Sequence, residues 1–445
     1  MEFFSMIGVL LGVFSIVYLI LKGMPVMIAA PLATSLVLVF SSMDLFTYLL
    51  GSESNHYMGA LGAYLINFFP IFLLGAILAK LMEDSGATTS IAEFILRRVG
   101  VDKPYRVMVA IFLIGLILTY GGISIFVVMF TIIPLARTLF QKMNISWRLI
   151  QIPLWLGIGC ITVTMLPGTP SIHNVIPIQF LNTSLTAAMF PSLVGAIGCA
   201  IFGLFYMKVE LRKSLKNGEI FSSIYAVEVP ETREVNSLPS FFMSLLPLLV
   251  LMLMITLGST FGSDFIQANI IYIALVGSIS LAFLLLSPYL SQKMETLRSA
   301  TNGAISAIFA TASAVAFGSV IVGTPGFSVF FEWILEIPGN PLISLVALTA
   351  LLSGVTGSSS GTLGIVMPNF AAYYLEAGVH PELIHRVAAI GSNITTHVPQ
   401  SGVFVMFLSL SKLNFKEGYK EGFIVISIGS LIAVTLVILL DSFMY

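Results

Sequence analysis

The positively charged residues of this chain would lie almost entirely on one side of a membrane, provided that two of its apolar segments turn back before they cross. The chain is 445 residues long and 57% apolar, and only 9% of its residues are charged. Because soluble domains carry about 25% charged residues, this composition predicts a membrane protein with many spans. Short cytoplasmic loops of such proteins are rich in Lys and Arg, so the positions of the 20 Lys and Arg residues constrain which segments cross.

Two apolar segments, 107–136 and 341–375, do not have the length of ordinary spans. A crossing helix needs about 20 apolar residues, so each segment is too short for two crossings and long for one. Glycines lie at their centres, Gly121 and Gly122 in the first segment and Gly357 and Gly361 in the second. Since non-helical backbone at membrane depth must be covered by protein or water, we predict two re-entrant helical hairpins. The ordinary spans are predicted at residues 3–21, 24–42, 60–79, 149–180, 186–207, 240–261, 268–290, 303–323, 386–410 and 421–441.

The charges that flank the two segments support the hairpin prediction. Basic residues stand on both sides of the first segment, within 80–106 and 137–148, so both of its ends are expected in the cytoplasm. Glutamates flank the second segment, within 332–336 and 376–382, and both of its ends are expected to face outward. With this topology every Lys and Arg except Arg386 lies on the cytoplasmic side, and both termini are extracytoplasmic.

The predicted fold is an all-α polytopic membrane protein made of two inverted repeats, each with five transmembrane helices and one re-entrant helical hairpin. An odd number of spans in each half inverts the second half relative to the first. Such repeats with broken helices are typical of secondary transporters whose site lies near the bilayer midplane. The expected parts are repeat 1 at 1–207, with hairpin 107–136 and broken helix 149–180, a cytoplasmic linker at 208–239, and repeat 2 at 240–445, with hairpin 341–375 and broken helix 386–410.

Four polar patches interrupted by Gly or Pro lie inside the apolar segments, at 119–124, 164–174, 356–362 and 393–402. Polar groups at membrane depth are costly and often functional, although single Ser and Gly residues also serve close helix packing. Because the patches form two repeat-related pairs, we predict that they bind the substrate. The predicted substrate-binding residues are Gly121, Gly122, Ser124, Gly168, Thr169, Ser171, Asn174, Ser358, Ser359, Ser360, Thr362, Gln400 and Ser401.

The predicted site contains no fixed charge, because no Asp, Glu, Lys or Arg falls within a span in this assignment. A substrate carboxylate would be held by hydroxyls, Asn amides and the N-terminal ends of half-helices, whose dipoles favour anions. We therefore expect a small organic anion as the partner, besides the lipid bilayer and without nucleic acid. The two cysteines, Cys160 and Cys199, provide neither a disulfide framework nor a metal site, and no cofactor is expected.

The coupling ion is predicted from the same residues. His173 and His397 are the histidines within the apolar segments, and a histidine with its usual pKa of about 6.5 can carry a proton. Each could equally bond a backbone group that the neighbouring helix break leaves free. If neither titrates, hydroxyls and carbonyls near the asparagines would hold sodium instead. The candidate coupling-ion residues are His173, His397, Asn174, Asn393 and Thr395.

Three runs of the sequence resemble the gluconate permease family, a part of the wider ion transporter superfamily: Leu166 to Pro177, Thr356 to Gly364, and Leu383 to Ala389. The resemblance covers most of the chain. It implies uptake of gluconate or short hydroxy acids, usually with protons, at the cell's inner membrane, by an elevator mechanism in a homodimer. By analogy, 1–80 and 240–323 form the scaffold, and the hairpins move with 149–207 and 386–441.

One position departs from the family pattern. The family's last broken helix reads Leu-Pro-His-Asn/Ser-Gly, whereas this chain has Gln400 in the place of that histidine and a histidine, His397, before the proline. A short-chain carboxylate such as a hydroxybutyrate is therefore an alternative to a sugar acid. A sodium/proton antiporter would be expected to carry embedded carboxylates. A membrane-embedded enzyme would be expected to carry a nucleophile or a metal-binding motif. An anion channel remains open as a further alternative.

Overall fold

The computed structural model describes residues 2–53, 55–99, 103–123, 125–225, 238–399 and 401–444. Over these ranges the chain is helical and has no β-strand, which confirms the all-α prediction. Among the described helices, seven are long and apolar enough to cross a membrane. These are Glu2–Ile20, Tyr57–Asp84, Trp147–Met165, Met189–Lys216, Asn269–Tyr289, Lys293–Val322 and Phe415–Leu440.

The helices of the first half begin where the sequence supplies helix-starting residues. Asp44 caps α3 by accepting from the Thr47 N–H at 2.7 Å, and Pro104 opens α6, where its missing N–H costs no intrahelical bond. The elements are α1 (Glu2–Leu21), α2 (Val26–Phe40), α3 (Leu45–Leu50), α4 (Tyr57–Asp84), α5 (Ala87–Val99), α6 (Pro104–Tyr120), α7 (Ile125–Lys142), η1 (Trp147–Ile150), α8 (Gln151–Leu154), η2 (Trp155–Met165), α9 (Ile172–Leu181), α10 (Met189–Lys216) and η3 (Ser223–Tyr225).

The second half uses the same devices. Prolines occupy the first positions of α14, α15 and α17, and the Thr324 and Asn340 side chains cap α14 and α15. The elements are α11 (Phe241–Phe261), α12 (Asp264–Leu286), η5 (Ser287–Tyr289), α13 (Lys293–Val322), α14 (Pro325–Leu335), α15 (Pro341–Thr356), α16 (Ser359–Glu376), α17 (Pro381–Gly391), α18 (Gly402–Ser411) and α19 (Phe415–Met444).

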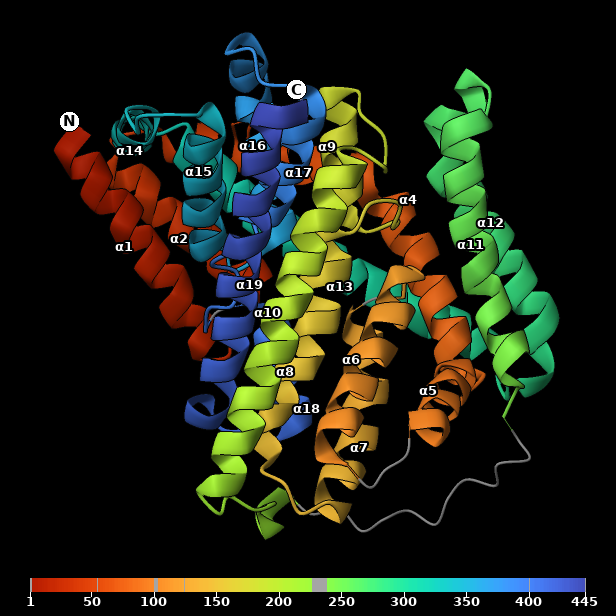
Figure 1. Cartoon of the computed structure of the whole chain (residues 1–445). Helices are drawn as coiled ribbons and strands as arrows, with labels where there is room; N and C mark the ends of the chain where they lie inside the picture. The colour runs from red at the N-terminus through yellow and green to blue at the C-terminus, as the bar shows by residue number, and fades with distance from the viewer. Residues whose placement is uncertain are drawn as a thin grey trace.

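Two helix pairs, α6–α7 and α15–α16, occupy the segments for which hairpins were predicted. The helices of each pair pack against each other and are joined by a short turn. The turns contain Gly122 with φ +83° and Gly357 with φ +62°, a left-handed conformation that glycine adopts without steric cost. In Figure 1, α6 and α7 lie in the lower part of the molecule and α15 in the upper part.

Both segments predicted as broken helices are interrupted. The first runs through η1, α8 and η2, stops after Met165 and resumes as α9; the second stops after α17 and resumes as α18. η2 is a π-helix of 11 residues, and the Thr162 hydroxyl donates to the Gly157 carbonyl five residues earlier at 2.8 Å. π-Helical turns are rare and concentrate at functional sites.

The helices form a broad assembly with the long α10 and α19 side by side near its middle (Figure 1). α4 packs on α13, and α12 packs on α4. In Figure 1, α11 and α12 lie at one edge, whereas α1, α2 and α14 lie at the opposite edge. α19 also contacts η2 and α17, so the two broken segments meet around it.

One charged residue corrects the sequence analysis. Arg386 was expected at the outer edge of a span, but it lies in the middle of α17 and its side chain has no solvent exposure. The expectation that no cation lies in the interior is therefore wrong. Near the other end of the molecule, α10 continues through residues that were assigned to the linker, and Glu210 on it is buried beside Arg148.

Candidate functional site

Two helix N-termini meet at the first helix break. Ser171 caps α9 and Ser358 caps α16. His173, in the first turn of α9, places its Nε2 atom 2.6 Å from the Oγ atom of Ser359, the first residue of α16. Because each helix N-terminus carries a partial positive charge, their meeting creates a place that favours an anion.

His173 connects the two elements through both ring nitrogens. Its Nδ1 atom lies 3.1 Å from the Ser171 hydroxyl, and Ser171 in turn donates to the Val163 carbonyl at 2.8 Å. The side chain is 7% exposed. His173 is thus part of a hydrogen-bonded chain that runs from the π-helix, through the break, to the tip of α15–α16.

The serines and threonines at this tip have different surroundings. Thr362 is fully buried and donates to the Ser358 carbonyl at 3.0 Å, and the Ser358 hydroxyl accepts from the Gly361 N–H at 3.1 Å. These two side chains hold the turn in shape. Ser359 and Ser360 are half-buried, as Ser358 is. The Ser359 hydroxyl meets His173, and the Ser360 hydroxyl lies 3.3 Å from that of Ser358.

The tip of α6–α7 rests against the same break from the other side. The Tyr120 hydroxyl donates to the Pro167 carbonyl at 3.1 Å, and a Cβ atom on Gly122 would lie 2.9 Å from Pro170 Cγ. Gly168 has φ +79°. Gly122 and Gly168 therefore shape the backbone of the site, and Gly121 beside them packs on Leu248. The predicted residue Ser124 lies outside the described residues.

Asn174 and Arg386 brace the first break. The Asn174 amide donates to the carbonyls of Leu166 and Thr169, each at 3.1 Å. Its oxygen accepts from the Arg386 guanidinium at 2.9 Å, and the same guanidinium donates to the Thr164 carbonyl at 3.1 Å. Asn174 thus makes hydrogen bonds to the protein with both its amide nitrogen and its oxygen, and these bonds hold the break.

Arg386 is the residue of the candidate site that the sequence analysis missed. It links α17 to η2, to α9 and to the loop before α10, where it donates to the Ala187 carbonyl at 3.2 Å. The signal was present, because Arg386 was the one basic residue that did not fit the charge asymmetry. Thr169, fully buried, accepts from the Ser171 N–H at 3.0 Å and supports the same turn.

The second break is held in a similar way. The Asn393 amide donates to the Gly159 carbonyl of the π-helix at 2.9 Å and to the Ser430 hydroxyl of α19 at 3.2 Å. The Thr395 hydroxyl lies 2.7 Å from that of Ser353 on α15 and donates to the Ala350 carbonyl. Ser401 is buried at the start of α18. The predicted residue Gln400 lies outside the described residues.

His397 has different neighbours from His173. Its ring lies among the rings of Trp155, Phe404 and Tyr419, with centroid distances of 5.1, 4.5 and 5.6 Å. It is 2% exposed. The two histidines that the sequence analysis grouped together therefore occupy separate environments.

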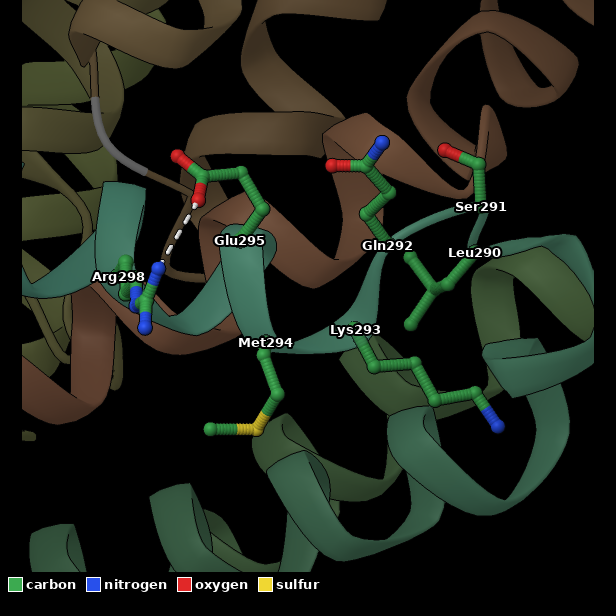
Figure 2. A pocket seen from close by; sticks show the side chains of 7 residues that line it. All are labelled: Leu290, Ser291, Gln292, Lys293, Met294, Glu295 and Arg298. Carbon is green, nitrogen blue, oxygen red and sulfur yellow. Dashed lines mark ion pairs between the residues drawn. The ribbon is translucent and has the colours of Figure 1, made fainter.

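A surface hollow lies at the start of α13, away from both breaks. Residues 290–295 and Arg298 line it, and Arg298 pairs with Glu295 at 3.9 Å (Figure 2). Both of these charged side chains are well exposed. The hollow is open and comes from a single stretch of chain, so it does not have the convergent polar groups of a binding site.

Residues 4–443 match the model of the family described as GntP family permease. The chain belongs to this family. Together with the apolar helices, this makes it a multi-span membrane transporter and not an enzyme. The resemblance that the sequence runs indicated is confirmed.

Individual relatives match over nearly the whole chain. The uncharacterized transporter YxjC of Bacillus subtilis (strain 168) is 29% identical over 454 residues, which cover 94% of this chain and 95% of that protein. The high-affinity gluconate transporter of Escherichia coli (strain K12) is 25% identical, with 93% of each chain covered. The crystal structure of the Alcanivorax borkumensis YdaH transporter shares the fold, with a TM-score of 0.58, 15% identity and 87% coverage of each chain.

Proposed function

We propose that this GntP family transporter is a secondary active symporter of a small organic carboxylate, such as gluconate or a short hydroxy acid, and that protons drive it. The observation that carries the proposal is the contact between His173 and Ser359, which brings the N-termini of α9 and α16 together. Several relatives are named gluconate transporters or permeases, and gluconate combines one carboxylate with hydroxyls. The carboxylate would face the helix ends, and Ser359 and Ser360 would bind its hydroxyls.

Protons are favoured over sodium by the contacts of Asn174. The Asn174 oxygen accepts from the buried Arg386 guanidinium, so a sodium ion beside it would meet a positive charge at close range. At the second break, the Asn393 amide N–H groups donate to protein acceptors, and the Thr395 hydroxyl is engaged with α15. A sodium ion near Asn174 is therefore disfavoured.

Matched packing of the two halves supports inverted repeats with re-entrant hairpins. The first hairpin helices match each other, since α6 packs on η2 and α15 packs on α17. The second hairpin helices also match, since α7 packs on α18 and α16 packs on α9. In each half the first hairpin helix lies on the helix before the break. The second hairpin helix lies on the helix after the break of the other half. Such an arrangement suits a mobile unit of hairpins and broken helices.

We extend the proposal to an elevator mechanism in a homodimer, with α4 and α13 in the fixed scaffold. α13 contacts α16, and Gly364 on α16 lies so close to Tyr64 of α4 that a Cβ atom would be 2.9 Å from its ring. The hairpin thus faces the scaffold across a close contact. The proposed location is the plasma membrane, the inner one where there are two, with both termini extracytoplasmic.

Uptake into liposomes tests this function. Purified protein in liposomes is given labelled gluconate or labelled 3-hydroxybutyrate under an inward pH gradient, an inward sodium gradient, or neither. We expect one of the two acids to accumulate under the pH gradient alone. Accumulation that needs sodium would contradict proton coupling, and equilibration without accumulation would favour an anion channel.

A pair of serine variants tests the site. Ser359→Leu should abolish uptake, because leucine removes the hydroxyl that meets His173 and fills the junction of the two helices. The matched control is Ser280→Leu on α12, where the serine is exposed and uptake should be unchanged. Near-normal uptake by folded Ser359→Leu protein would remove the α9–α16 junction from the transport path.

A further inference from the structure

The Nε2 atom of His397 is buried and has no hydrogen-bond partner among the described residues. In a neutral imidazole one ring nitrogen carries a proton and the other keeps a lone pair. When the lone pair is on Nε2, this atom can accept a proton.

Aromatic rings surround this imidazole, and their faces would offset part of the cost of burying a charge on it. The rings of Phe404, Trp155 and Tyr419 come from α18, η2 and α19, and their centroids lie 4.5, 5.1 and 5.6 Å from that of the imidazole. An aromatic face attracts a cation within about 6 Å of its centroid. Tyr419 is stacked on the imidazole with an interplanar angle of 22°, so a charge on the ring would lie over its face.

Gly422 is what lets the free nitrogen reach this position. A Cβ atom on Gly422 would lie 2.6 Å from His397 Nε2 and 2.9 Å from Trp155 Nε1. Like Nε2, the Trp155 Nε1 atom is buried with no hydrogen-bond partner among the described residues. Two unsatisfied polar nitrogens thus point at one glycine of α19. A buried polar atom without a partner costs free energy, so this convergence calls for a functional explanation.

The other charged groups near the ring are already paired or exposed. On α19, Glu421 binds the Arg148 guanidinium of η1, and Lys420 is exposed. On α8, Gln151 bonds the Glu417 carbonyl and the Gly422 N–H. The side chains that face the imidazole from η2 and α18 are aromatic, and Tyr419 is the titratable side chain that faces it from α19.

We propose that His397 is the site at which this transporter takes up its coupling proton, and that Gly422, which has no side chain, leaves the space beside its Nε2 atom. The inference rests on the proposed function and assigns the proton to one of the two candidate histidines. A hydronium ion transfers its proton to the Nε2 lone pair and leaves as water, and the reverse step releases the proton on the other side. His173, with both nitrogens on serine hydroxyls, belongs to the anion site instead.

A short path connects the two sites. Thr395, two residues before His397, contacts Ser353 and the Ala350 carbonyl on α15. α15 leads directly into the tip whose Ser359 meets His173. A charge on His397 that shifts the second break would therefore move the tip that holds the anion. By linkage, the proton then favours anion binding as much as the anion favours the proton.

Two transport assays on the same liposomes separate proton coupling from substrate binding. The first measures accumulation of labelled gluconate under a pH gradient, and the second measures exchange of labelled for unlabelled gluconate at equal pH. A gradient of about one pH unit sustains about tenfold accumulation when one proton accompanies each anion. We expect His397→Gln to lose this accumulation and keep exchange, whereas His173→Gln should lose both.

Two further variants probe the surroundings of the ring. Gly422→Ala should also lose accumulation and keep exchange, because the added methyl group displaces Nε2 without altering the imidazole itself. Its control is Gly303→Ala on α13, where an added Cβ meets nothing within 4 Å. Trp155→Phe keeps an aromatic ring and removes Nε1, and it should shift the pH at which accumulation is half-maximal.

Several results would overturn the assignment. Full accumulation by His397→Gln would show that the proton binds elsewhere, and loss of exchange in folded His397→Gln protein would place this residue in the anion site. If the wild-type protein exchanges gluconate without accumulating it, proton coupling itself is wrong. If it does not exchange gluconate, the proposed substrate is wrong. ¹⁵N-histidine NMR then decides on its own, because the wild-type spectrum must contain an imidazole that gains a proton over the pH range of the assay, and this signal must be missing in His397→Gln.

Discussion

At the scale of single residues, the site is built mostly by side chains that satisfy backbone groups. A helix break frees carbonyls and N–H groups in a medium that offers no water to replace their partners. Asn174, Asn393 and Arg386 bond such groups at the two breaks. The types of the two asparagines alone suggested substrate or ion binding, and only their contacts reveal the bracing role. The hydroxyls of the proposed substrate site lie where α9 meets α16.

Replacement of Arg386 by glutamine should destabilise the protein strongly. The change takes a donor from the carbonyls of Thr164 and Ala187 and from the Asn174 oxygen, and each buried acceptor left unsatisfied costs about 1–3 kcal/mol. The midpoint of thermal unfolding in detergent measures the effect. Arg97→Gln is the control, since Arg97 is 65% exposed and its ion pair among the described residues is with Glu93, one helical turn away, and exposed pairs contribute about 0–1 kcal/mol. Equal midpoints for Arg386→Gln and wild type would contradict the bracing role.

At the scale of helices, the sequence predicted the existence of most elements but not the π-helical geometry of η2. Glycine, proline and polar residues inside apolar runs predicted the broken segments. The length of the two hairpin segments and their flanking charges predicted the glycine turns at 121–122 and 357. The π-helix η2 had no such signal, because its hydrogen-bond register depends on what packs against it. Gly157 touches the backbone of α6, a contact that exists only in the folded protein. Residues 208–216 were assigned to the linker because they are charged, yet they continue α10.

The contact between η2 and α6 gives a prediction at this scale. A Cβ atom on Gly157 would lie 2.8 Å from the Phe112 carbonyl oxygen and 3.2 Å from the Leu116 nitrogen, and backbone atoms cannot move aside as a side chain can. Gly157→Ala should therefore destabilise the protein by about 1–3 kcal/mol, as overpacking of a core does. Gly62→Ala on α4, where an added Cβ meets nothing within 4 Å, should be neutral or gain up to about 1 kcal/mol from helix propensity. Thermal unfolding of the two variants side by side gives the comparison, and a neutral Gly157→Ala would show that α6 and η2 are not in such close contact.

At the scale of the whole molecule, the distribution of charge and the packing of helices bear on the proposed topology independently. The charge pattern depends only on where Lys and Arg fall in the sequence, and it predicts that the two hairpins enter from opposite sides. The packing depends on contacts between elements far apart in the chain, and it pairs α7 with α18 and α16 with α9. Arg386, the exception to the charge pattern, lies inside the protein and not in a loop, so the rule for loop charges does not apply to it.

Labelling of introduced cysteines tests this topology directly. The two natural cysteines are buried, so a membrane-impermeant thiol reagent should leave them unmodified in intact cells. Lys103→Cys and Met143→Cys flank α6–α7, and a re-entrant hairpin requires both to react only when the cytoplasmic side is opened. Asn340→Cys and Ala377→Cys flank α15–α16, and both should react in intact cells. If either pair were labelled from opposite sides, that hairpin would be a complete crossing, the following spans would change direction, and the inverted repeat would be lost with it.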